Sequence, residues 1–186
     1  GLYSNLYTQL RRAKPAGQLL FDKEPWPDEN EQEENSLRQA LLAISSLNEE
    51  QTRQQITSLE EQHSIRRSWI WAQLGEANLA LALHHLAILS RETATVIGGA
   101  TPDEMARGYM ESGQSADRAV WQAMTAVTRS EDRKAVAAAI RALYLPWLEK
   151  CAAHFQKLVQ SHPLPSTELA GIGEKSCWLF CDGLRF

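Results

Sequence analysis

One segment of this sequence has to be enclosed by the rest of the chain when it folds. The stretch from Glu76 to Ser90 is apolar almost all the way round a helix, through Leu79, Leu81, Leu83, Leu86, Ile88 and Leu89. A helix with this pattern is buried among other helices. The chain can supply such neighbours, because 44% of its 186 residues are hydrophobic and only 23% are charged. We therefore expect an all-α fold, a multi-helix bundle built around this segment.

Helices are also predicted on both sides of the central segment, because apolar residues recur there every three or four positions. Their expected starts are common capping residues: Ser36, Asn48, Thr101, Ser115 and Ser130. The helix that begins at Asn48 should run to Leu74 and end at Gly75. The last helix should reach about His162, with a kink at Pro146. Trp147, beside that kink, is predicted to lie in the core.

The sequence is predicted to divide into four regions. Residues 1–21 indicate an N-terminal helix with one apolar face, formed by Leu2, Tyr3, Leu6, Tyr7 and Leu10. Residues 22–35 combine a run of acidic residues with two prolines, which favours a solvated linker. Residues 36–165 form the helical bundle domain. Residues 166–186 begin a different structural unit.

Charge and cysteine content exclude several classes of protein. Nineteen basic residues against 23 acidic ones give a net charge of −4, which argues against binding to nucleic acid through overall positive charge. No apolar run approaches the roughly 20 residues that cross a bilayer, so we expect no membrane association. The opening residues do not resemble a signal peptide. Three cysteines are too few for a disulfide scaffold and favour a reducing, cytoplasmic location.

Few side chains in the helical part have the spacing of a metal site. Glu60 and His63 are three residues apart, as in di-iron bundles, but such sites need a second copy of the pair. His84 and His85 are adjacent, so they point about 100° apart and cannot share one ion. We expect one of these two histidines at the surface and the other against the core.

A second group lies near the middle of the chain, where Arg66 and Arg67 precede Trp69 and Trp71. Basic and aromatic side chains together could contact a phosphate and stack on a base, giving weak contact with nucleic acid. The alternative is an aromatic edge of the core, with the two arginines extending over it toward solvent.

The C-terminal residues change character. Residues 176–181, Ser-Cys-Trp-Leu-Phe-Cys, are apolar on both faces and precede Asp182 and Gly183, which predicts a buried strand followed by a turn. Cys177 and Cys181 are expected to be buried thiols rather than metal ligands. A single strand does not fold alone. Its partners are expected in sequence beyond this chain or in a second copy, which would make a strand-mediated homodimer.

The same C-terminal residues, Cys-Trp-Leu-Phe-Cys-Asp-Gly-Leu-Arg-Phe, resemble the opening motif of the PglZ domain, a member of the alkaline-phosphatase superfamily found in BREX bacteriophage-defence systems. Three upstream segments resemble the helical region that precedes this domain in type B members: Ser-Ile-Arg-Arg-Ser-Trp-Ile-Trp-Ala-Gln-Leu-Gly-Glu-Ala, Leu-Ala-x-Ala-Leu-x-His-Leu-Ala and Ala-Leu-Tyr-Leu-Pro-Trp-Leu-Glu. The resemblance covers most of the chain from about Asn48 onward.

This resemblance implies that the chain is a fragment of a metal-dependent phosphatase or phosphodiesterase. Asp182 matches the aspartate that binds one of the catalytic divalent metals, zinc or manganese, in that superfamily. The other ligands and the nucleophile would lie downstream, so the fragment itself is expected to be inactive and to hold no metal. The alternative is a helical protein–protein interaction module of a defence complex, with no catalytic activity. Either way, the implied partners are other phage-defence proteins.

Overall fold

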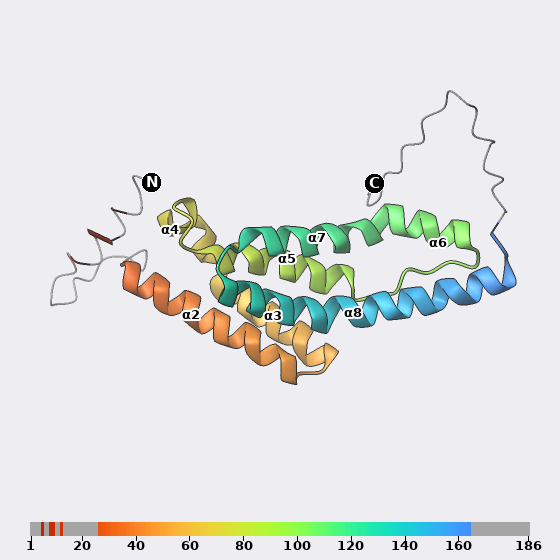
Figure 1. The fold of residues 1–186 in the computed structure, drawn as a ribbon, viewed down its shortest axis with the longest axis horizontal. Coiled ribbons are helices and arrows are strands. Elements are labelled where there is room, and N and C mark those ends of the chain that lie inside the picture. Colours follow the sequence, from red (N-terminus) through yellow and green to blue (C-terminus); the bar gives the residue numbers. More distant parts are fainter. Residues whose placement is uncertain (1–4, 6–7, 10–11, 13–25, 165–186) are drawn as a thin grey trace, which may run out of the picture.

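A computed structural model describes residues 5, 8, 9, 12 and 26–164 (Figure 1). Within these residues, every regular secondary-structure element is a helix, and turns and loops join the helices. The main helices are α2 (Pro27–Ala43), α3 (Glu49–His63), α4 (Ile70–Gln73), α5 (Asn78–Glu92), α6 (Pro102–Gly108), α7 (Gln114–Ala126) and α8 (Ser130–Ser161). Short helical turns join some of them: η1 (Ile44–Ser46), η2 (Ser64–Ser68) and η3 (Tyr109–Gly113). The expected all-α bundle is confirmed over this part of the chain.

Helix α5 is the centre of the bundle, as its sequence predicts. It contacts α2, α3, α7 and α8, and Figure 1 shows it running through the middle of the assembly. Leu79, Leu83, Leu86 and Leu89 are completely buried in one continuous core. That core contains residues from every long helix, so the helices form a single packed unit.

Several predicted helix ends are confirmed. Asn48 caps α3 through a capping box, in which Asn48 Oδ1 accepts from the Gln51 backbone N–H and Gln51 Oε1 accepts from that of Asn48. Thr101 caps α6 by accepting a hydrogen bond from the Glu104 backbone. Gly75 follows α4 with a φ of 76°, a conformation that glycine adopts without strain, but it does not end the helix that begins after Asn48, as predicted.

Helix α8 is the longest element, with 32 residues and Pro146 inside it. Trp147 is buried, as predicted, and its indole Nε1 donates a hydrogen bond to the carbonyl oxygen of Thr95 at 2.9 Å. Further along α8, His154 Nε2 lies 3.0 Å from the Gly99 carbonyl oxygen. These two contacts hold the loop between α5 and α6 against the side of α8.

The acidic linker predicted over residues 22–35 is wrong from Pro27 onward, because those residues form the first turns of α2. Pro27 occupies the start of the helix, where a missing N–H costs no hydrogen bond. Asp28 and Glu29 lie in the first turn, where carboxylates interact favourably with the helix dipole. Ser36 therefore lies inside α2 and caps nothing.

Three other boundaries also differ from the prediction. The helix that begins after Asn48 ends at His63 instead of Leu74, and η2 and α4 follow it. Ser115 is not a cap, because α6 continues through the π-helical turn η3 into α7. Ser130 is the first residue of α8, and Arg129 takes the capping position without a side-chain hydrogen bond.

Two predicted elements lie wholly or partly outside the described residues. Of the expected N-terminal helix, the described positions Asn5, Thr8, Gln9 and Arg12 are helical and exposed. The predicted strand at residues 176–181, its two cysteines and Asp182 are all outside the described part. Across the part that is described, none of the helices has the length and apolar character needed to span a bilayer.

Candidate functional site

The pair singled out as a possible metal site is used for other contacts. Glu60 Oε1 accepts from Arg67 Nη2 at 2.6 Å and lies 3.8 Å from His84 Nδ1. His63 is buried, with its Nδ1 3.3 Å from Arg66 Nη1. Burial and the nearby Arg66 guanidinium lower the pKa of His63. Within residues 26–164, no three metal-binding side chains are grouped closely enough to hold an ion.

The adjacent histidines divide as predicted. His84 is exposed, whereas His85 is half-buried against the core, and their rings meet edge to face with centroids 5.2 Å apart. Burial, together with the positive charges that His84 and Arg67 can carry, lowers the pKa of His85. The two histidines therefore pack against each other on the surface of α5.

Arg66 does not extend over the core edge toward solvent, as the sequence suggested, but is only 1% exposed. Its Nη2 donates to Glu34 Oε1 at 2.8 Å and to Asn30 Oδ1 at 2.9 Å. Its guanidinium also lies over the Trp69 ring, 5.6 Å from the ring centroid. Because Arg66 and Trp71 are both buried, a nucleic acid cannot reach either residue in this fold.

Glu34 is the centre of this buried polar cluster. Besides the pair with Arg66, Oε2 accepts from the Leu79 backbone N–H at 2.9 Å and Oε1 from that of Ala80 at 3.4 Å. These are N–H groups in the first turn of α5, so a side chain of α2 caps another helix. Burial raises the pKa of Glu34, and Arg66 and the two backbone N–H groups oppose that shift. The cluster joins α2, η2 and α5 and is structural.

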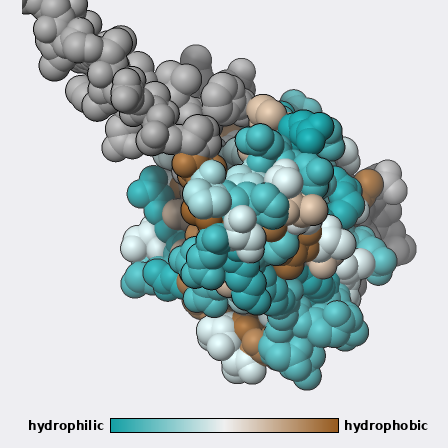
Figure 2. Space-filling view, turned by 90° about the vertical axis from the view of Figure 1, so that its right-hand side faces the viewer, coloured by the Kyte–Doolittle hydropathy of each residue, from teal (hydrophilic) through white to brown (hydrophobic). Residues whose placement is uncertain are grey.

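An apolar groove between α6 and the second half of α8 is the best candidate for a functional surface. Its volume is about 420 Å³, and its walls are almost entirely apolar. The groove is lined by Ile97, Met105, Ala106, Tyr109, Met110, Asp117, Tyr144, Trp147, Leu148, Cys151, Ala152 and Phe155. Figure 2 views the end of the molecule where α6 and the last turns of α8 lie, and hydrophobic surface shows there between hydrophilic side chains.

The wall formed by α8 has a regular spacing. Tyr144, Leu148, Cys151 and Phe155 are separated by four, three and four residues, so they form one stripe along the helix. Leu148 is 43% exposed and Phe155 39% exposed, although both belong to the apolar pattern of α8. Cys151, between them on the same stripe, is buried, so the stripe is covered at its centre and open at Leu148 and Phe155.

Polar groups at the base of the groove are already satisfied by one another. Asp117 is buried and accepts hydrogen bonds from the hydroxyls of Tyr109, at 2.6 Å, and Tyr144. Burial raises the pKa of the Cys151 thiol, although its contact with the Ile97 backbone acts in the opposite direction. A protonated thiol is a weak nucleophile. The groove is therefore suited to binding an apolar group.

Gly113 lies close to two side chains that line the groove, Ile97 and Tyr109. A Cβ atom at this position would lie 2.6 Å from Ile97 Cδ1 and 2.7 Å from Tyr109 Cδ2. Only glycine lets η3 approach Ile97 this closely. Sequence reasoning missed the groove because its walls come from residues about 50 positions apart, which local periodicity cannot connect.

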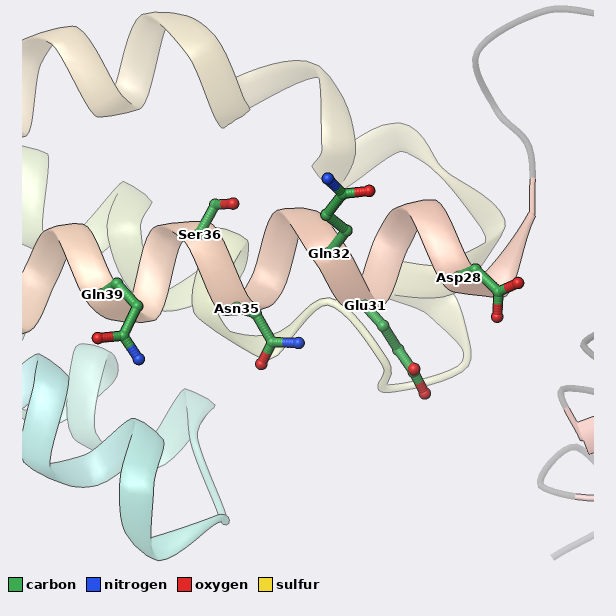
Figure 3. A pocket seen from close by; sticks show the side chains of 6 residues that line it. All are labelled: Asp28, Glu31, Gln32, Asn35, Ser36 and Gln39. Atoms are coloured by element: carbon green, nitrogen blue, oxygen red, sulfur yellow. The ribbon is translucent and has the colours of Figure 1, made fainter.

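A second hollow lies on the outer side of α2 but lacks converging groups. Figure 3 shows that its six labelled side chains all come from this one helix and point in different directions: Asp28, Glu31, Gln32, Asn35, Ser36 and Gln39. A binding site needs side chains that converge on one point. This face is the polar surface of a helix.

Comparison with known proteins finds no matching family model, no matching curated protein and no matching solved structure. The candidate site is therefore interpreted from its own geometry and chemistry.

Proposed function

We propose that the bundle formed by residues 26–164 is an interaction module that binds an amphipathic helix of a partner protein in the groove between α6 and α8. The observation that carries this proposal is the apolar stripe on α8, in which Leu148 and Phe155 are exposed. Its four-three-four spacing is that of a helix-packing seam, in which side chains of a second helix fit between those of the first. Leu148 and Phe155 would then be covered by the partner.

The second wall of the groove supports the same kind of ligand. Met105 and Tyr109 are four residues apart and face the groove from α6 and η3. Met110 is exposed at its edge. Methionine side chains adapt to different apolar partners because they are flexible and polarisable. An inserted helix would contact both walls and bury apolar surface on each.

On the resemblance to PglZ proteins, we further propose that this module belongs to a phage-defence protein and that its partners are components of the same system. The phosphatase activity would reside in the downstream domain, with Asp182 as one ligand of its divalent metal. The support for this part is the C-terminal motif and the tryptophan-containing segments in the sequence.

Binding can be tested with the full chain and each purified protein of such a defence system by isothermal titration calorimetry. Replacing Leu148 or Phe155 with Asp should weaken binding by about tenfold or more, because a charge would enter an apolar contact. Leu145→Asp is the matched control, since Leu145 is 46% exposed on the same helix but does not line the groove. Equal affinities for all three variants would show that the partner does not bind in the groove.

The phosphatase part is tested separately. A longer protein that contains this chain, supplied with Zn²⁺ or Mn²⁺, should hydrolyse an aryl phosphate ester. Asp182→Ala should abolish that activity by removing a metal ligand. Full activity in this variant would exclude the role proposed for Asp182 without affecting the groove.

A further inference from the structure

A basic surface with one exposed aromatic ring lies where α7 and α8 run side by side. Trp121, on α7, is 60% exposed, although tryptophan is on average a highly buried residue. Between residues 114 and 148 the exposed charged side chains are five bases and one acid: Arg118, Arg129, Arg133, Lys134, Arg141 and Glu131. The other two acidic residues there, Asp117 and Asp132, are buried. This part of the surface is therefore positive, although the whole chain has a net charge of −4.

Helix geometry places Trp121 beside Arg141. Helices α7 and α8 are antiparallel neighbours joined by a short connection (Figure 1), and the Tyr144 hydroxyl on α8 donates to Asp117 on α7. Trp121 follows Asp117 by four residues, which is one turn of α7. Arg141 precedes Tyr144 by three residues, which is one turn of α8. Because the helices are antiparallel, both steps lead toward the connection, so the two side chains are neighbours. Arg118, three residues before Trp121, lies beside it on α7.

The cations nearest to Trp121 have no carboxylate partner among the described residues. Within this part of the chain, Arg118, Lys134 and Arg141 form neither an ion pair nor a side-chain hydrogen bond. Lys134 is seven residues from Arg141, so it lies on the same face of α8, about 10 Å away along the helix. An anionic ligand can therefore pair with these three side chains without displacing a carboxylate.

A positive surface around an exposed tryptophan suits a single-stranded nucleic acid. Phosphates of the backbone pair with the cations, and an unpaired base stacks on the aromatic ring. An acidic peptide matches the charge but does not by itself use the Trp121 ring. A membrane surface takes up several apolar side chains. Between residues 114 and 148, the other large apolar side chains that are exposed are Leu145 and Leu148, and Leu148 lines the groove. Charge and aromatic exposure together therefore favour the nucleic acid.

We propose that the surface formed by Arg118, Trp121, Lys134 and Arg141 binds single-stranded nucleic acid without sequence preference. Trp121 stacks on one base, and the three cations pair with phosphates near it. Bases inside a duplex are stacked on one another and cannot offer a face to Trp121, so a duplex binds more weakly. None of the four side chains lines the groove, so this proposal does not rest on the function proposed there.

Fluorescence anisotropy with the full chain tests the proposal. The probes are labelled strands of dT and of rU, each about 20 nucleotides long and so longer than a typical binding site. With three phosphate contacts, the logarithm of the binding constant should fall against the logarithm of the salt concentration with a slope of about −2. Trp121→Ala should weaken binding about tenfold and leave this slope unchanged. Arg141→Ala should weaken binding and make the slope shallower by about 0.7. Binding of either strand supports the proposal, and the ratio of the two affinities tells whether RNA or DNA is preferred.

Lys157→Ala and Phe155→Ala are the matched controls. Lys157 is an exposed cation on α8, about 24 Å further along the helix than Arg141, and Phe155 is an exposed aromatic residue in the groove. Both variants should bind the strands as the unaltered chain does, and circular dichroism checks that every variant is folded. Absence of strand binding at low salt would overturn the proposal, and so would equal losses in the controls and in Trp121→Ala. Binding to phosphatidylserine vesicles but not to the strands would instead identify a membrane as the ligand and overturn it as well.

Discussion

At the scale of single residues, the buried pair of Glu34 and Arg66 shows how a charge is tolerated inside a helical bundle. Each Glu34 oxygen has a partner, either the guanidinium or a backbone N–H of α5. These hydrogen bonds offset part of the cost of taking two charges out of water, although the buried Arg66 Nε has no hydrogen-bond partner among the described residues. The pair joins α2 to η2, and Glu34 also fixes where α2 meets the start of α5, because it accepts from the Leu79 and Ala80 backbone N–H groups.

Glu34→Gln should destabilise the protein by about 3–5 kcal/mol, because it leaves the Arg66 charge buried without a counter-charge. The free energy of unfolding can be measured by urea denaturation. Glu33→Gln, on the neighbouring and half-exposed residue, should change it by less than about 0.5 kcal/mol. A small effect of Glu34→Gln would mean that Arg66 finds another partner.

A pH dependence is expected from His63. Its folded pKa is lowered by burial and Arg66, an effect that Glu33 and Glu60 only partly oppose. The unfolded chain therefore binds more protons between the folded pKa and the ordinary value of about 6.5. Stability should fall as the pH drops below about 6.5.

Urea denaturation at pH 7.5 and pH 5.5 measures this loss, and His63→Gln should reduce it. The dependence should not vanish, because the pKa of His85 is lowered as well. An unchanged difference between the two pH values in His63→Gln would contradict the assignment to His63.

At the scale of elements, α8 has two roles along its length. Its first half is covered by other helices, with Val136, Ala139 and Leu143 fully buried. Its second half contributes to the core through Trp147 and presents Leu148 and Phe155 to the groove. The transition falls near Pro146, where the helix lacks one backbone donor.

Trp147→Ala should cost about 3–5 kcal/mol, since it removes a large buried side chain. It also removes the hydrogen bond to Thr95 that holds the α5–α6 loop. Thermal and urea unfolding measure the loss. Leu145→Ala on the same helix should cost far less, because Leu145 is largely exposed. Similar losses for the two variants would contradict this description of α8.

At the scale of the whole molecule, the described bundle is organised around α5. One core cluster includes residues of α2, α3, α5, α7 and α8. This core separates the charged cluster of Glu34 and Arg66 at one end from the apolar groove at the other. A substitution in one of them therefore changes no direct contact of the other. A partner bound in the groove would not contact Glu34 or Arg66.

Leu83→Ala, at the centre of α5, should cost about 2–5 kcal/mol and lower the unfolding midpoint of every helix together. Far-ultraviolet circular dichroism reports the helices, and tryptophan fluorescence reports the packing. The two transitions should coincide, as expected for one cooperative unit. Separate transitions would show that the bundle contains two folding units.

Local sequence was sufficient to predict most of the bundle. The apolar pattern of residues 79–89 predicts the central helix, and Asn48 and Thr101 mark helix starts that depend on nearby hydrogen bonds. Trp147 is buried as its position in a repeating apolar pattern indicates. The sequence does not predict the start of α2, because prolines and repelling acidic residues disfavour a helix there. The burial of Leu37 and Leu41, which stabilises α2, comes from tertiary packing.

By itself, then, the sequence determines that this chain forms helices and which of them must be central, because periodicity and capping act within a few residues. Only the tertiary structure decides that Arg66 is buried beside Glu34 and that Phe155 is left uncovered. Both outcomes depend on which helix packs against which face, through contacts between residues tens of positions apart. Periodicity shows that a helix has an apolar face, but it does not show what covers that face.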